Sequence, residues 1–302
     1  MASTRMTLPE LAEKYNCEDS CRSYLEKLRW PTGPVCPKCQ GKDVARVGGR
    51  ESVLRCKGCQ QQFTVTAGTV FNDSHLPLTK WLMAAYLICE SKKGMSALQI
   101  QRVLGIGGYK TAWYLCHRIR SAMIESQKEL LKGIVEIDET YIGGKARKFR
   151  PRHEKQVVIG IRVRGGDLRL IRAAEATSEA IRQIINENVG EDVEVIMTDE
   201  SAIYPFAFND KQRKLHKTVC HSREYVSGNV HTNTVESAFS LLKRGIIGTW
   251  HKVSVKHLPV YLDEMVFRFN RRKNQDLFAD TLRHMVTAPV LTFEKLTKEK
   301  AA

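Results

Sequence analysis

Apolar and polar positions follow two different periods along this chain, and the change falls near residue 130. Before that point apolar residues recur every three or four positions, the spacing of amphipathic helices. After it, short β-branched runs alternate with helical stretches, which favours strands packed against helices. The first part predicts helices over residues 7–15, 18–30, 77–91, 96–104 and 110–128, with two antiparallel strands at 53–55 and 62–65.

The second part opens with residues 133–144, a β-branched strand that ends at a glycine pair. A hairpin follows, because two strand-like runs are joined by Gly165-Gly166-Asp167. Helices and strands then alternate, as a mixed sheet with flanking helices requires. The expected elements are strands 157–164 and 168–173, helix 178–189, strand 193–199, segment 204–208, a helix that opens at Asn233 or Thr234, and a long helix 255–271.

Four of the nine cysteines form two Cys-x₂-Cys pairs with sixteen residues between them. A redox Cys-x₂-Cys needs no second pair, whereas a closed tetrahedral zinc site does. Cys17 and Cys21 lie one helical turn apart, but no partner pair is left for them, so they are expected to be free thiols. The predicted ligands of one structural Zn²⁺ are Cys36, Cys39, Cys56 and Cys59.

The net charge of +15 points to a polyanionic partner, and its distribution is more informative than its size. Residues 76–128 hold eight Lys/Arg against two Glu, and residues 145–155 hold six against one. No apolar run approaches the length of a membrane span, and the N-terminus lacks a signal peptide. We therefore expect no membrane association, and a cytoplasmic, nucleoid-associated location in a bacterium or a nuclear one in a eukaryote.

A short helix, a glycine turn and a longer helix between residues 96 and 128 have the order of a helix-turn-helix, whose second helix can enter a major groove of DNA. Plain helix packing gives the same pattern, and residues 145–155 can equally be a solvated loop. Double-stranded DNA is the expected partner. The candidate contacts are Lys110, Thr111, Tyr114, His117 and Arg118 on the second helix, and Lys145, Arg147, Lys148, Arg150 and Arg152 in the basic stretch.

Three carboxylates stand at corresponding places in the second part of the chain. Asp138 and Asp199 come at the predicted ends of two strands, and Glu236 lies in the first turn of a helix. Each has an ordinary explanation, because Asp favours turns and the helix dipole favours Glu236. Together they can converge on a pair of Mg²⁺ or Mn²⁺ ions, which prefer oxygen ligands. Glu139 and Glu200 follow the two aspartates and are expected to point away from them.

Three sequence runs resemble the transposases of one group of small bacterial insertion sequences and their eukaryotic Merlin relatives. They are IDETYIGGK from Ile137, TDES from Thr198 with Tyr204 after it, and the long run from His231 to Arg272 that begins HTNTVESAFSLLKRG. The resemblance implies a DDE enzyme with an RNase H-like catalytic domain. It also implies that Asp138, Asp199 and Glu236 bind two catalytic metal ions. Lys243 lies two helical turns after Glu236 and is similar to a basic residue of such enzymes that can contact a DNA phosphate, although a solvated helix lysine stays open. Arg244 beside it is a further candidate for contacting DNA.

The fold class is therefore expected to be multidomain α+β / α/β. The resemblance implies an enzyme that binds the terminal inverted repeats of its element, cleaves DNA and joins the 3′-hydroxyl ends to target DNA, as a homodimer or higher oligomer. Two alternatives stay open, an inactive DNA-binding regulator and a metal-dependent nuclease of the same fold. The expected segments are a helical entry (1–32), a zinc ribbon (33–73), a helix-turn-helix domain (74–130), an RNase H-like catalytic domain (131–273) and a polar C-terminal tail with one weak helix (274–302).

Overall fold

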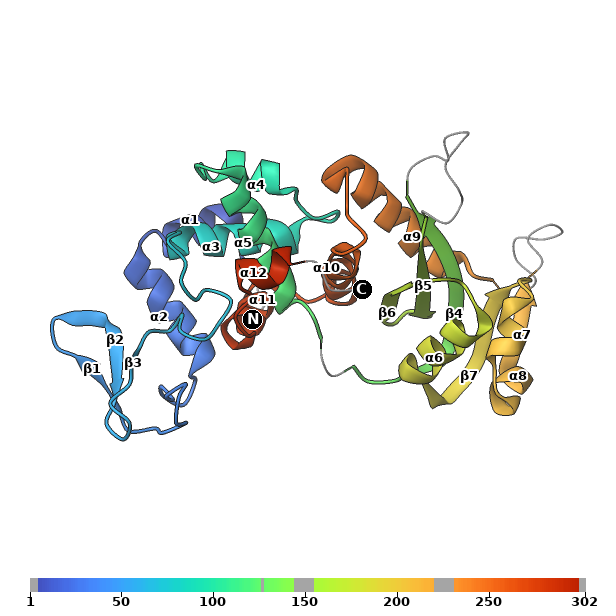
Figure 1. Cartoon of the computed structure of the whole chain (residues 1–302), viewed down its shortest axis with the longest axis horizontal. Helices are drawn as coiled ribbons and strands as arrows, with labels where there is room; N and C mark the ends of the chain where they lie inside the picture. The colour runs from blue at the N-terminus through green and yellow to red at the C-terminus, as the bar shows by residue number, and fades with distance from the viewer. Residues whose placement is uncertain (1–4, 126–127, 144–154, 220–230, 299–302) are drawn as a thin grey trace. The chain divides into compact units, whose positions relative to one another are not determined.

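The computed structural model describes residues 5–125, 128–143, 155–219 and 231–298, and the chain divides into two compact units (Figure 1). Unit 1 comprises residues 1–124 and 272–302, and unit 2 comprises residues 125–271. Unit 1 is helical apart from one small sheet, whereas unit 2 is built on a larger mixed sheet. Among the described residues, no helix is both long and apolar enough to cross a membrane.

Unit 1 begins with two short helices, α1 (Leu8–Lys14) and α2 (Glu18–Arg29), close to the predicted bounds. A capping box starts α1: the Thr7 hydroxyl accepts from the Glu10 amide at 3.4 Å, and the Glu10 carboxylate accepts from the Thr7 amide at 2.7 Å. Helix α2 buries Cys21 and Leu25. Local sequence signals are therefore sufficient to place both helices.

A three-stranded antiparallel sheet follows α2. Its strands are β1 (Val44–Val47), β2 (Arg50–Cys56) and β3 (Gln62–Phe63), in that order. The sequence predicted β2 and β3 but not β1. None of the four residues of β1 is fully buried, so its sequence lacks the alternation of apolar and polar residues that indicates a strand. Leu54 and Phe63 are the only buried residues of its core besides Cys36 and Cys56, so the sheet has little apolar area to hold it together.

The remaining N-terminal helices are α3 (Leu78–Glu90), α4 (Ala97–Val103) and α5 (Tyr109–Ala122). The Ser96 hydroxyl caps α4 by accepting from the Gln99 amide at 3.1 Å. Gly105, with a φ of +56°, allows the turn between α4 and α5. The helix-turn-helix order is thus present, although α5 ends six residues before the predicted end.

The C-terminal segment departs most from expectation. Instead of a polar tail it forms α11 (Leu277–Thr287) and α12 (Phe293–Thr297), and α11 packs against α2, α3 and α5 within unit 1. Leu282 and Met285 are fully buried, and the ring of Phe278 lies 5.6 Å from that of Tyr86. The average composition of this segment is polar, but the apolar residues of α11 recur at helical spacing among polar ones, so the helix is amphipathic.

Unit 2 is built on a five-stranded mixed sheet of order β6-β5-β4-β7-β8. Strand β4 pairs antiparallel with β5 and parallel with β7, while β5–β6 is antiparallel and β7–β8 parallel. This arrangement is consistent with the expected RNase H-like domain. The strands are β4 (Leu131–Ile142), β5 (Gln156–Val163), β6 (Leu168–Ala173), β7 (Val189–Asp199) and the unpredicted β8 (His216–Val219).

Helices cover both faces of this sheet (Figure 1). Successive residues of β5 show the two faces: Ile159 belongs to one buried core and Val158 to the other. Helices α6 (Ser178–Asn188) and α7 (Ile203–Ala207) complete the first core, and α8 (Asp210–Leu215) contacts β7. The second core contains α9 (Asn233–Gly245), the π-helical turn η2 (Ile246–Trp250) and α10 (Leu258–Asn270), which begins three residues later than predicted.

Candidate functional site

Two parallel strands bring Asp138 and Asp199 to the same level of the sheet. Glu136 on β4 is paired with Met197 on β7, and each aspartate lies two residues further along its strand. Residues two apart in a strand share a face, so both carboxylates project from the same face of the sheet at the same level along the strands. Asp199 ends β7, as predicted, whereas Asp138 lies inside β4, which continues to Ile142 with β5 as partner.

The structure adds Glu139 to this pair. Carboxylate oxygens of Asp138, Glu139 and Asp199 lie within 4.8 Å of one another, a donor set that suits a hard divalent cation. The expectation that Glu139 points away was wrong in its consequence. Glu139 does leave β4 on the opposite face from Asp138, because its Oε2 accepts a hydrogen bond from Tyr204, a residue of the core on the Ile159 face. However, β7 ends at Asp199, so side chains from both faces of β4 can meet beyond the end of β7.

Electrostatics show that this acidic group is unfavourable on its own. The pKa of Asp138 is raised to about 7, chiefly by burial and also by the charges of Glu139, Asp199 and Glu236, against a lowering hydrogen bond from the Glu139 amide at 2.8 Å. Burial also raises the pKa of Glu139, partly offset by the hydroxyl of Tyr204. A bound cation would relieve the repulsion, so the residues fit Mg²⁺ or Mn²⁺.

Glu236 approaches the group from α9 without joining it. It lies in the first turn of the helix, as predicted, and its charge contributes to the raised pKa of Asp138. Its Oε1 accepts from the Thr232 hydroxyl at 3.0 Å, and it is not among the three carboxylates that lie within 4.8 Å of one another. The structure thus brings two of the three predicted acidic residues together and places the third nearby.

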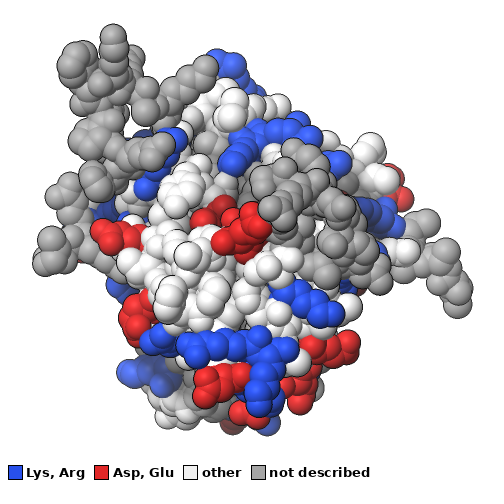
Figure 2. All heavy atoms as spheres, turned by 90° about the vertical axis from the view of Figure 1, so that its right-hand side faces the viewer, with Lys and Arg blue, Asp and Glu red and all other residues white. Residues whose placement is uncertain are grey.

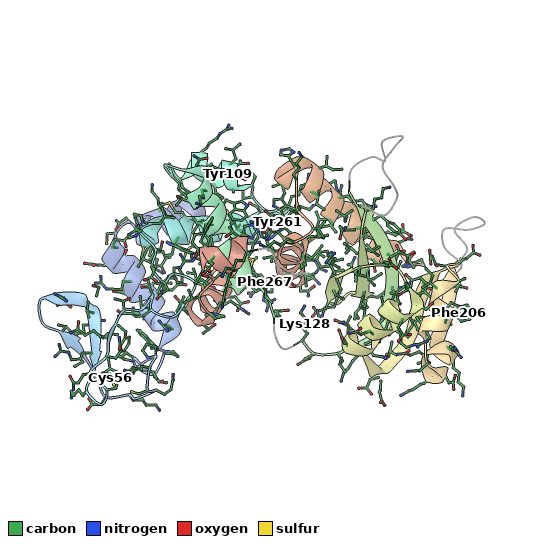
Figure 3. All side chains as sticks on the ribbon, viewed as in Figure 1. Cys56, Tyr109, Lys128, Phe206, Tyr261 and Phe267 are labelled. Carbon is green, nitrogen blue, oxygen red and sulfur yellow. The ribbon has the colours of Figure 1, made fainter. Side chains whose placement is uncertain are left out.

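The four predicted zinc ligands converge in unit 1. All four sulfur atoms lie within 4.8 Å of one another, and the Cys36–Cys59 and Cys39–Cys56 Sγ pairs are each 3.6 Å apart. A tetrahedron with Zn–S bonds of about 2.3 Å has edges of about 3.8 Å, so the spacing fits a zinc ion. Figure 3 labels Cys56 in this ribbon. Burial raises the pKa of the Cys36 thiol, but hydrogen bonds from the Cys39 and Lys38 amides and with the Cys59 and Cys39 thiols together lower this pKa to about 7.

The predicted DNA-contacting face of α5 is only partly available. Lys110 and Thr111 are exposed at the start of the helix, beside Tyr109, which Figure 3 labels. His117 and Arg118 are buried, with 1% and 3% of their surface exposed, so their assignment to the outer face was wrong. Arg118 instead donates to the Asn72 carbonyl.

The C-terminal segment accounts for part of this difference. Phe293 of α12 packs edge-on against Tyr114 at 5.5 Å and lies 4.3 Å below the Lys110 ammonium, and Tyr114 donates to the Leu291 carbonyl. Tyr114 is therefore half-buried by residues more than 170 positions away in the chain. A helical wheel drawn from α5 alone cannot reveal such cover.

The other predicted DNA contacts divide into two sets. Lys243 and Arg244 are exposed near the end of α9, seven and eight residues after Glu236. On the face of the molecule in Figure 2, acidic side chains form a compact central patch, with basic side chains above and below it. The stretch with Lys145, Arg147, Lys148, Arg150 and Arg152 lies outside the described residues.

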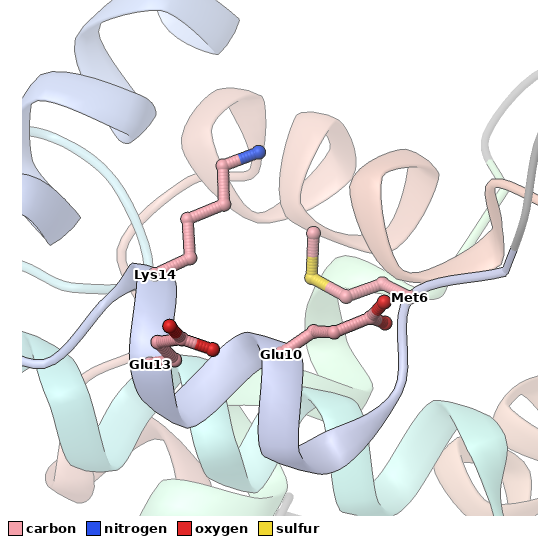
Figure 4. A pocket seen from close by; sticks show the side chains of 4 residues that line it. All are labelled: Met6, Glu10, Glu13 and Lys14. Atoms are coloured by element: carbon pink, nitrogen blue, oxygen red, sulfur yellow. The ribbon is translucent and has the colours of Figure 1, made fainter.

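A pocket beside α1 offers no competing site. Met6, Glu10, Glu13 and Lys14 line it, and Figure 4 shows the two carboxylates and the ammonium spread around an open depression. Among the described residues, groups of three or more possible metal ligands occur at the cysteine group and the acidic group, and the side chains that line this pocket belong to neither. The pocket therefore does not change the choice of site.

Sequence reasoning excluded Glu139, which belongs to the acidic group, and did not single out Glu136, which lies two residues before Asp138. The latter is fully buried on β4, a rare place for a charged residue without partners. A signal was available, because Glu136 stands between apolar residues of a strand that is covered on both faces. Its hydrogen-bond partners are residues of α9 and Arg164, which follows β5, and the sequence alone did not indicate that these residues lie beside Glu136.

Comparison with known proteins gives two family matches and one relative. An ISXO2-like transposase domain matches residues 130–270, and a transposase zinc-ribbon domain matches residues 16–62. A protein of Halobacterium salinarum described as an uncharacterized protein in transposable element ISH50 is 30% identical over 266 residues, covering 81% of this chain and 88% of the relative. The match to the transposase domain covers the acidic group, and the match to the zinc-ribbon domain covers the cysteine group.

Proposed function

Because the chain belongs to the family of ISXO2-like transposases with an N-terminal zinc ribbon, we propose that it binds the terminal inverted repeats of an insertion sequence, cleaves DNA there and joins the ends to target DNA. The observation that supports the chemistry is the convergence of Asp138 and Asp199 at the end of the parallel strand pair, with Glu236 of α9 close enough for its charge to raise the pKa of Asp138. This is an arrangement for phosphoryl transfer.

In this proposal Asp138, Asp199 and Glu236 hold the catalytic metal ions. Two bound Mg²⁺ or Mn²⁺ ions would activate the attacking oxygen and stabilise the leaving one. Glu139 approaches the same point but its Oε2 is engaged by the Tyr204 hydroxyl at 2.5 Å, so we assign it to orienting the group. The exposed Lys243 and Arg244 lie on α9, the helix that carries Glu236, and supply positive charge for the phosphates of bound DNA.

The test is a reaction of the full-length protein with labelled element ends, Mg²⁺ and a target plasmid. We expect ends with a free 3′-hydroxyl, followed by covalent joining of those ends to the plasmid, and no protein–DNA adduct. Cleavage without joining would indicate a nuclease, and binding without cleavage would indicate a regulator. A trapped protein–DNA adduct would contradict the proposal, since it requires a side-chain nucleophile.

DNA recognition is assigned to the exposed start of α5. Replacing Lys110 by Ala in the full-length protein should weaken binding to element ends and reduce the slope of log K against log salt by about 1, because one phosphate contact is lost. Thr111→Ala should weaken binding without changing that slope. The measurement is a fluorescence titration at several salt concentrations.

The matched control is Lys14→Ala, which removes an exposed charge from α1 of the same unit. Equal effects of Lys14→Ala and Lys110→Ala would show that α5 is not the reading helix. A fragment that ends near residue 128 is unsuitable for this test, because it lacks α11 and with it part of the core of unit 1.

A further inference from the structure

Glu136 is a buried carboxylate whose partners come mostly from another element. It lies on β4 two residues before Asp138 and is completely inaccessible to solvent. Burying an ionised carboxylate is costly unless hydrogen bonds replace its water. Its Oε2 accepts from the Thr234 amide at 2.9 Å, the Thr234 hydroxyl at 2.7 Å and the Val235 amide at 3.1 Å, while its Oε1 accepts from Arg164 Nε at 2.8 Å.

These contacts put Glu136 in the role that an N-cap residue usually has. The first amides of a helix lack partners within the helix, and the helix dipole favours a negative charge there. The N-cap residue of α9, Thr232, makes no capping hydrogen bond with its side chain, because its hydroxyl donates to Glu236 instead. A strand residue therefore caps α9 from outside, which ties the beginning of the helix to β4.

Two arginines, Arg162 of β5 and Arg164 directly after that strand, contact the same turn of α9. Arg162 donates to the Thr234 carbonyl and, at 3.1 Å, to the Ser237 hydroxyl. Arg164 donates to the His231 carbonyl at 3.0 Å, and His231 Nδ1 lies 3.3 Å from Glu136 Oε1. Glu236 lies between the residues held in this way. Hydrogen bonds from Glu136, Arg162 and Arg164 thus hold the turn that carries Glu236 against the sheet.

A glycine allows the helix to come this close. Gly160 of β5 is paired with Asp138, and a Cβ atom at Gly160 would lie 2.6 Å from the Phe239 ring and 2.8 Å from Val235 Cγ2. Both of those side chains belong to α9 and pack in the core beneath it. The distance between α9 and β4 therefore depends on hydrogen bonds at Glu136 and on the missing side chain at Gly160.

We propose that Glu136 is a positioning residue that fixes the first turn of α9, and with it Glu236, relative to Asp138 and Asp199. This rests on the proposed role of Glu236 as a metal ligand. A residue that orients a ligand without touching the metal changes metal affinity or activity by roughly 10- to 100-fold when it is removed. Glu136 itself faces α9 and Arg164 with both oxygens, so it acts through the helix.

The test is a double-mutant cycle in the full-length protein with Mn²⁺ as the probe. Mn²⁺ affinity, from electron paramagnetic resonance titration, and the rate of end cleavage are measured for wild type, Glu136→Gln, Glu236→Gln and the double variant. We expect Glu136→Gln to weaken Mn²⁺ binding about tenfold. In the Glu236→Gln background the same change should have no further effect, because the ligand it positions is already lost.

A milder variant guards against loss of folding. Thr234→Val keeps the side-chain volume and removes one hydrogen bond to Glu136 Oε2, so it should weaken Mn²⁺ binding a few-fold, again only when Glu236 is present. Glu194→Gln, an exposed glutamate of β7, is the matched control and should change nothing. Gly160→Ala should resemble Glu136→Gln, because it forces α9 away from the sheet.

Each outcome has a distinct meaning. Additive effects of Glu136→Gln and Glu236→Gln, or unchanged Mn²⁺ affinity in both Glu136→Gln and Thr234→Val, would overturn the positioning role. If Glu236→Gln alone left Mn²⁺ affinity and cleavage intact, the assignment of Glu236 as a ligand would fail instead. A general loss of stability caused by Glu136→Gln would lower the melting temperature in both the wild-type and the Glu236→Gln background. A positioning effect would lower Mn²⁺ affinity in the wild-type background and have no effect on it in the Glu236→Gln background.

Discussion

Replacing Asp138 by Asn should abolish DNA cleavage and yet make the metal-free protein more stable. The loss of activity follows because the amide keeps the shape of the side chain but removes the charge that holds a catalytic cation. Several kcal/mol of transition-state stabilisation depend on such an ion, so we expect the cleavage rate to fall by about 10³-fold or more. Binding to element ends should persist, because it rests on Lys and Arg contacts.

The gain in stability follows from the raised pKa of Asp138. Between its ordinary pKa of 3.8 and about 7, the folded chain keeps a proton on Asp138 that the unfolded chain has released, so stability falls as the pH rises through this window. Asn carries no such charge. Above pH 7 the variant should therefore be more stable, by on the order of 1–2 kcal/mol, since the side chain is only partly buried and water screens it.

Thermal unfolding at pH 5 and pH 8 without divalent cations, with cleavage assays at pH 8, tests both effects. Mn²⁺ should stabilise the wild-type protein at pH 8 and the Asn variant much less. Glu200→Gln is the matched control, because Glu200 is exposed beside Asp199 and outside the acidic group. An Asp138→Asn protein that still cleaves DNA would refute the assignment of this residue as a metal ligand.

Removing the zinc ion should unfold the ribbon. Its core contains only Leu54, Phe63 and two of the four cysteines as buried residues, too few for a stable fold without a further cross-link. Zinc binding to comparable small domains contributes an apparent free energy of about 10–16 kcal/mol at neutral pH. We expect one zinc ion per chain, and none retained after Cys56→Ser or after treatment with a strong chelator.

Hydrogen exchange locates the effect. Amides of β1, β2 and β3 should lose protection in Cys56→Ser, while those of β4 and β7 in unit 2 keep theirs. Cys17→Ser, which changes an exposed cysteine outside the group of four, should retain the zinc ion and the protection. Absence of zinc from the purified wild-type protein, or an unchanged melting curve for Cys56→Ser, would exclude a structural zinc site.

The proposed DNA contacts are divided between the two units. Lys110 and Thr111 belong to unit 1, whereas Lys243 and Arg244 lie on the helix that carries Glu236 in unit 2. Recognition and chemistry are therefore assigned to separate compact units. This separation explains why a change at Asp138 is expected to leave binding to element ends intact.

The sequence alone was sufficient wherever the signal is local. The β-branched run of β4, the helices α1 and α4, and the hairpin between β5 and β6 each depend on neighbouring residues, and all were predicted. The cysteine group was also predicted, because two Cys-x₂-Cys turns at this spacing have few other uses. Asp138 and Asp199 were found because each belongs to a recognisable strand, although Asp138 lies inside β4 and only Asp199 ends its strand.

Only the tertiary structure decided which residues surround these elements. Residues of α12 cover part of α5, which local periodicity could not show, and His117 and Arg118 proved to be buried. Glu139 joins the acidic group because β7 ends at Asp199, and Glu136 caps a helix that begins almost 100 residues later. Periodicity records which face a side chain leaves from, but burial, strand ends and helix caps depend on partners that the folded chain brings from elsewhere.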